Sequence, residues 1–162
     1  MKTLSRLIGL ALLMVCAADV RAGSREDACD AVYRKLSRGP HESLTKSNES
    51  FTEDGKQYHG CVIHLSGNAK RVTDSQRADG LFGASLPYCP DGKLPADLPP
   101  DLVNEDGWCG DKMADGPDGT FYRALRGNIF CTVQGEWDGG DDGDPTYVPS
   151  THYEVIVKCA SR

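Results

Sequence analysis

The four histidines are the first residues to test for catalysis, because imidazole exchanges protons readily near neutral pH. None stands in an H-E-x-x-H pattern, and the chain has no G-x-S-x-G elbow, no P-loop and no G-x-G-x-x-G turn. His64 and His152 fall on predicted outward strand faces, where either could work with a loop aspartate. The sequence therefore favours a non-catalytic protein, and an extracytoplasmic hydrolase using His64 or His152 is the alternative.

Cysteine is the other reactive residue type, and the chain has seven, an odd number for a disulfide protein. The count becomes even if Cys16 lies in a secretory signal peptide. Lys2 and Arg6 precede an apolar run of twelve residues, and small residues stand before a cleavage point after Ala22. The run is shorter than the ~20 residues that cross a bilayer, so the sequence predicts no transmembrane segment. An uncleaved anchor and lipid attachment to Cys16 are the alternatives.

The sequence thus divides into a signal peptide over 1–22 and a single globular domain over 23–162. The domain keeps six cysteines, an even number that predicts a disulfide framework in a periplasmic or secreted protein. Zinc ligation would need closely spaced pairs, whereas the nearest cysteines are 20 positions apart. The predicted disulfide cysteines are Cys29, Cys61, Cys89, Cys109, Cys131 and Cys159.

The first half of the domain predicts one helix and one hairpin. Residues 24–38 carry a helical apolar stripe, a capping serine with an acid three residues later, and a Gly-Pro stop. Residues 41–50 are polar and predict a loop. Asp54-Gly55 is a preferred two-residue hairpin turn, so we expect strands over 50–53 and 56–65. The stretch 68–78 predicts a short helix.

The second half predicts a loop followed by strands. Five prolines make regular structure unlikely over 87–107, and a disulfide between Cys89 and Cys109 would close this loop. Alternating apolar residues predict strands over 120–126, 129–137 and 151–159. The fold class is therefore α+β, with the N-terminal helix packed on an antiparallel sheet of about five strands and stabilised by disulfides.

The remaining disulfide partners depend on strand register. If the last hairpin is centred on residue 144, Cys131 faces Val157 and Cys159 is a diagonal neighbour of Cys131. Diagonal Cα atoms lie ~7–8 Å apart, beyond the ~6.8 Å that a disulfide spans. We therefore expect Cys29 and Cys61 each to bond one of the last two cysteines.

Charge restricts the class of partner. Residues 23–80 hold nine basic and nine acidic side chains, whereas residues 81–162 hold six basic and fourteen acidic ones. The negative charge of the domain thus belongs to its C-terminal half, which disfavours nucleic acid and anionic membrane surfaces. A basic or neutral protein partner fits this distribution, and the sequence makes no prediction of oligomeric state.

Acidic turns form the predicted contact region, together with one tryptophan. The loop after residue 137 is rich in Asp and Gly, as calcium loops are, but it lacks the bidentate Glu and flanking helices of an EF-hand. The favoured interpretation is a solvated hairpin loop, and no cofactor is predicted. The alternative is a Ca²⁺ site whose ligands are Asp138, Asp141, Asp142 and Asp144. The predicted partner-binding residues are Trp108, Asp115, Asp118, Asp138, Asp141, Asp142 and Asp144.

These observations predict a small exported, disulfide-bonded, non-catalytic binding or inhibitor protein with an acidic C-terminal half. The prediction depends mainly on the absence of a catalytic motif. The alternatives are the hydrolase described above and a calcium-stabilised surface module.

Overall fold

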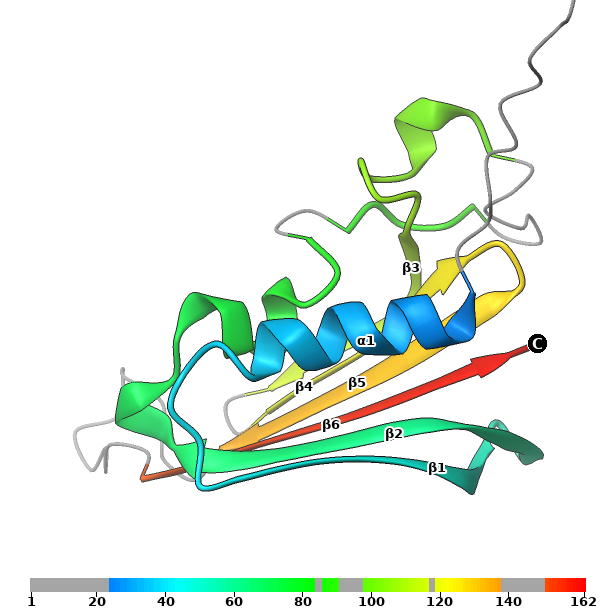
Figure 1. Cartoon of the computed structure of the whole chain (residues 1–162). Coiled ribbons are helices and arrows are strands. Elements are labelled where there is room, and N and C mark those ends of the chain that lie inside the picture. The colour runs from blue at the N-terminus through cyan, green and yellow to red at the C-terminus, as the bar shows by residue number, and fades with distance from the viewer. Residues whose placement is uncertain (1–23, 84–85, 91–97, 117–118, 138–150) are drawn as a thin grey trace, which may run out of the picture.

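The computed structural model describes residues 24–83, 86–90, 98–116, 119–137 and 151–162, and it has the predicted α+β fold. One helix packs on an antiparallel sheet whose strand order is β1-β2-β6-β5-β4-β3 (Figure 1). The elements are α1 (Arg25–Leu36), β1 (Ser43–Glu53), β2 (Lys56–Asn68), β3 (Cys109–Gly116), β4 (Gly119–Arg126), β5 (Ile129–Trp137) and β6 (His152–Ser161).

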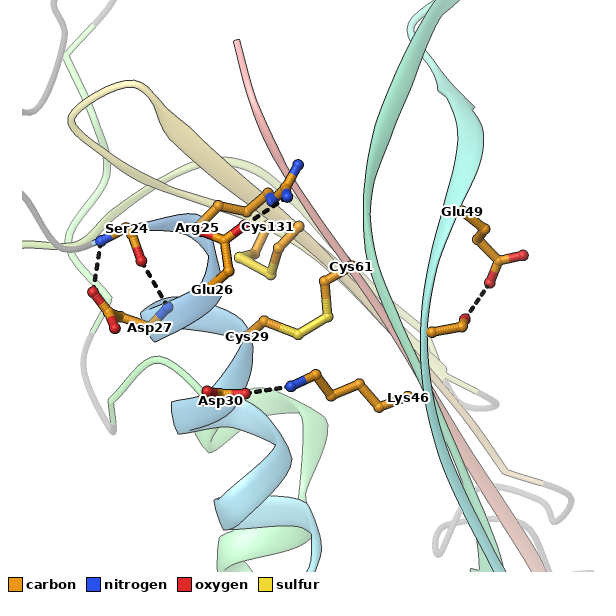
Figure 2. Close-up of a disulfide and its surroundings, with 12 residues drawn as sticks. Ser24, Arg25, Glu26, Asp27, Cys29, Asp30, Lys46, Glu49, Cys61 and Cys131 are labelled. Carbon is orange, nitrogen blue, oxygen red and sulfur yellow. Dashed lines mark hydrogen bonds and ion pairs between the residues drawn. A yellow bond between two sulfur atoms is a disulfide. The ribbon is translucent and has the colours of Figure 1, made fainter.

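The helix α1 forms where its capping signal and apolar stripe predict it. The Ser24 hydroxyl accepts a hydrogen bond from the Asp27 backbone N–H, and the Asp27 carboxylate accepts one from the Ser24 N–H at 2.8 Å. Its buried face packs on β2 and β6, and Figure 2 shows Cys29 of that face bonded to Cys61 on β2. The buried helix residues are Ala28, Cys29, Val32 and Leu36.

The first hairpin has the predicted turn but a longer first strand than predicted. Asp54 and Gly55 take φ angles of 50° and 72°, as a turn with two left-handed residues requires. The predicted loop over 41–50 is wrong for most of its length, because β1 already begins at Ser43 and pairs with β2 throughout. β1 is an edge strand in which only Phe51 is buried, so its polar composition reflects solvent exposure and not the absence of regular structure.

Among the described residues the sheet has six strands, one more than the expected five, because Cys109–Gly116 forms β3 at the opposite edge. β3 pairs with β4, and the register shifts between Gly110 and Lys112. Tyr88 adds a single parallel bridge to Gly110 beyond β3. This strand is polar and contains two glycines, so it shows none of the apolar alternation that predicted the others.

Three disulfides connect these elements, and only one pair matches the prediction. The predicted Cys89–Cys109 bridge is present. The other two are Cys29–Cys61 and Cys131–Cys159, so the expectation that Cys29 and Cys61 bond the last two cysteines is wrong. The last hairpin is centred on residue 145 and not 144, which places Cys131 directly opposite Cys159 with their Cα atoms 4.1 Å apart. A directly opposed pair is within the reach of a disulfide, whereas the expected diagonal pair is not.

The segment after β2 forms three short 3₁₀ helices, Ala69–Arg71, Asp74–Gln76 and Ala78–Gly80, and not the single helix predicted over 68–78. Side chains from other elements satisfy its buried polar groups. The Tyr122 hydroxyl donates to the Ala78 carbonyl at 2.5 Å, and the Tyr153 hydroxyl accepts from the Ala78 N–H at 2.7 Å. The buried Gln76 amide donates to the Leu36 carbonyl at the end of α1. The sheet thereby determines the position of this segment.

Replacing Tyr122 by phenylalanine is expected to lower the free energy of unfolding by about 1–3 kcal/mol, because the buried Ala78 carbonyl loses its donor. Burial also raises the pKa of Tyr122 above its ordinary value of 10.0. The neutral phenol therefore contributes fully below pH ~10, and that contribution falls as the pH rises further. Urea unfolding at pH 7 and above pH 10 measures both effects. An unchanged midpoint at pH 7, or an alkaline loss equal to that of wild type, would contradict the role of Tyr122.

The face of the sheet opposite α1, here called the second face, is half covered by the chain itself. Phe51 of β1 lies 6.3 Å from Phe130 of β5, measured between ring centroids, although two strands separate them in the sheet. The Arg123 guanidinium on β4 donates to Asp54 at the hairpin tip and to Asp111 on β3. The β1–β2 hairpin, the long bowed ribbon in Figure 1, therefore curls across the second face toward β4.

Candidate functional site

The second face has an apolar half and a half that the described residues leave open. The apolar half is a separate core beneath the curled hairpin, formed by Phe51, Val62, Cys89, Cys109, Leu125, Phe130 and Ala160. The open half lies at the other end of β3, β4, β5 and β6, where the structure contains a depression of about 830 Å³. Because strand side chains alternate between faces, the second-face residues of these four strands form its floor, and residues at the strand ends form its rim.

The depression combines an aromatic ring, an amide and several ionisable side chains. Phe121 of β4 pairs in register with Gln134 of β5, and Gln134 in turn with Ile156 of β6. The strand ends and the glycines at the β3–β4 turn complete it. The lining residues are Ala114, Asp115, Gly116, Gly119, Thr120, Phe121, Gln134, Gly135, Glu136, Trp137, His152 and Glu154.

Two carboxylates stand directly opposite each other in this depression. Glu136 on β5 is the register partner of Glu154 on β6. Gln134 donates a hydrogen bond to the Glu136 carboxylate at 2.5 Å, and among the residues that the structure describes neither glutamate has an ion pair with a basic side chain. Like charges directly opposite on adjacent strands destabilise a sheet. A cationic group placed between them would remove that repulsion.

The two histidines considered for catalysis do not form one site. His152 is the register partner of Asn68, whereas His64 is that of Ile156, four positions further along β6. At about 3.4 Å per residue their positions lie roughly 13 Å apart along the sheet. Both side chains are exposed as predicted, and His152 alone lines the depression.

The predicted acidic contact residues are described only in part. Asp115 on β3 lines the depression and accepts a hydrogen bond from the Thr120 hydroxyl. The others, Asp118, Asp138, Asp141, Asp142 and Asp144, lie outside the described residues. Among the described residues, no three His, Cys, Asp or Glu side chains gather into a metal-binding group. Calcium binding by the loop that joins β5 to β6 therefore remains a prediction.

Trp108 does not share this surface. Its side chain is 4% exposed and packs 4.6 Å from the Phe82 ring on the α1 side of the sheet. The Asn104 side chain accepts from its backbone N–H at 2.8 Å and orders the preceding turn. The structure thus corrects the prediction of Trp108 as a surface contact residue, because a tryptophan before a cysteine in a Pro-rich segment gives no sequence signal of burial.

Sequence reasoning did not single out Glu154, Gln134 or Phe121. The missing signal was register: a hairpin centred on residue 145 places Glu136 opposite Glu154, whereas centring on 144 places Glu136 opposite His152. Trp137 at the end of β5 stacks on Tyr153 with ring centroids 6.2 Å apart. It joins the core to the depression.

Comparison with family models, with curated proteins and with solved structures finds no match to this chain. No helix among the described residues is long and apolar enough to span a membrane.

Proposed function

We propose that this protein is an exported, non-catalytic binding or inhibitor protein that uses the open half of its second face to bind a basic segment of a partner protein. The observation that carries the proposal is the opposed pair Glu136 and Glu154 in an open depression. A lysine or arginine side chain from a partner would remove the repulsion between the two carboxylates and gain charge-assisted hydrogen bonds.

The rest of the depression supports a peptide-like ligand. The Phe121 ring offers apolar contact beside the acidic pair. An aromatic anchor with a polar rim is the usual composition of a protein-binding surface. The three disulfides support export of the protein from the cytoplasm, since such bridges persist mainly in exported proteins.

A lysine decapeptide labelled with a fluorophore tests the charge requirement by anisotropy at low salt. We expect E136Q/E154Q to weaken binding by about tenfold or more, which corresponds to about 1.4 kcal/mol. D101N/E105Q is the matched control, because it removes two exposed carboxylates outside the depression and has the same net charge. Equal weakening by both variants would show that only net charge matters and would overturn the proposal.

Affinity capture then identifies the natural partner. The oxidised domain and both double variants are used to capture proteins from the exported fraction of the source cells. A partner of the second face is retained by wild type and by the control variant, is lost with E136Q/E154Q, and is released as salt rises. A partner that all three capture equally binds elsewhere and contradicts the proposed site.

A further inference from the structure

A second recess lies on the α1 side of the sheet, away from the depression described above. Its volume is about 120 Å³, and it lies between α1, the turn at Leu81 and Phe82, and the end of β4. Apolar side chains form its walls, including the buried Val32, Phe82 and Trp108. The charged side chains in it are Lys35, Asp106 and Arg126.

Arg126 is the unusual member of this recess. Its Nε is the only buried side-chain nitrogen or oxygen, among the described residues, that lacks a hydrogen-bond partner. Its guanidinium lies 4.6 Å from the centroid of the Trp108 ring, and no described residue accepts a hydrogen bond from its Nε. Asp27 and Asp106 lie near enough to affect its charge, but neither forms an ion pair with it in the described part of the chain.

Buried polar groups in native proteins nearly always have partners, so an unpaired arginine donor beside a recess points to a missing acceptor. The Lys35 ammonium adds positive charge there while it donates to the Leu81 carbonyl at 2.7 Å. A carboxylate fits the planar fork of a guanidinium through two parallel hydrogen bonds. The apolar walls would then surround a short aliphatic tail, and the volume limits the ligand to a few heavy atoms.

We propose that this recess binds a small aliphatic carboxylate of about the size of acetate or propionate, with Arg126 as the residue that binds the carboxylate. Trp108 forms the wall beneath the guanidinium and provides a spectroscopic signal. The site is independent of the proposed binding of a basic segment, since the two use different faces of the sheet.

The test is a titration of Trp108 fluorescence with sodium acetate. The chain has two tryptophans, so W137F serves as the background in which Trp108 is the sole emitter. We expect a saturable change with acetate and none with acetamide, which has the same shape without the charge. No saturable change up to about 100 mM acetate, where a site of millimolar Kd is filled, would overturn the proposal. An equal response to sodium chloride would also overturn it, by showing a site for any small anion.

Variants of Arg126 assign the site. R126M keeps an unbranched stem over Trp108 but has no donor, and it is expected to weaken acetate binding at least tenfold. R126K keeps the charge without the fork and should give intermediate affinity. R71M is the matched control, because Arg71 is exposed outside the recess, and its affinity should stay within twofold of wild type. Circular dichroism confirms folding of each variant, and unchanged acetate binding by folded R126M would contradict the assignment.

Discussion

R123M is expected to lower the free energy of unfolding by about 2–3 kcal/mol and to release the tip of the β1–β2 hairpin from the sheet. The Arg123 side chain is only 19% exposed. Its Nε donates to Asp111 at 2.7 Å, and its Nη1 donates to Asp54 at 2.6 Å. The hydrogen bonds to Asp111, and further the one to Asp54, raise the pKa of Arg123 above its ordinary range, so the group stays charged wherever the domain is folded.

The free energy of unfolding is expected to fall because the carboxylates of Asp111 and Asp54 remain after the guanidinium is removed. Removal of one partner from a buried ion pair typically costs about 3–5 kcal/mol, and we expect less here because the Asp54 side chain is 46% exposed. Urea unfolding measures the total effect, and amide hydrogen exchange localises it. We expect faster exchange at the hairpin tip, around Phe51 and Tyr58, than in β5.

Two comparisons make this prediction specific. R71M alters an exposed arginine and should change the free energy of unfolding by less than about 0.5 kcal/mol. A double-mutant cycle with D54N isolates the contact between β4 and the hairpin tip. A zero coupling energy in that cycle, or exchange that rises equally in every strand, would contradict the role of Arg123 in holding the hairpin.

Some elements could be predicted because short-range sequence patterns specify them. The helix α1 follows from its Ser24–Asp27 capping box, and the first turn from Asp54-Gly55. The central strands β5 and β6 follow from apolar alternation, because one of their faces is buried against α1.

The edges and the long-range contacts could not be predicted in the same way. β1 and β3 are edge strands that bury little apolar surface, so their polar sequences resemble loops. The register of β5 and β6 depends on a connection of fourteen residues, 138–151, which is too long for a defined hairpin turn to specify it. The candidate site depends on that register, since Glu136 and Glu154 meet only through it. The contact of Arg123 with Asp54 joins residues 69 positions apart and has no local signal.

The same register leads to the second large expected effect, which concerns the disulfide framework. Cys159 on β6 is opposed to Cys131 on β5 and, on its other side, to Cys61 on β2. All three are buried in the core beneath α1, and Cys29 of α1 bonds Cys61. Cys159 thus has two register partners, and we expect the presence of Cys131 to determine which of them it bonds.

C131A is therefore expected to rearrange the disulfides when the reduced chain is folded in a glutathione buffer. The Cys159 thiolate attacks the Cys61 sulfur, a Cys61–Cys159 bond forms, the Cys29–Cys61 bond breaks, and Cys29 leaves as a thiolate. Glutathione disulfide in the buffer supplies the oxidation that first forms the disulfides, and the exchange step itself consumes no oxidant, because one disulfide replaces another. In the chain-entropy model the new loop of 98 residues stabilises the fold by about 1 kcal/mol more than the loop of 32 that it replaces, which favours the exchange.

Alkylation of free thiols followed by mapping of a non-reduced digest distinguishes the two outcomes. In C131A we expect the label on Cys29 and a peptide that joins Cys61 to Cys159. The matched variant C131A/C159A has no competing thiol and should keep Cys29–Cys61, with a free energy of unfolding lower than wild type by about 3.5 kcal/mol for the lost loop of 28 residues. A label on Cys159 with Cys29–Cys61 intact in C131A would show that opposition in the sheet does not decide the partner. The position of Cys29 on α1 would then be what directs the pairing.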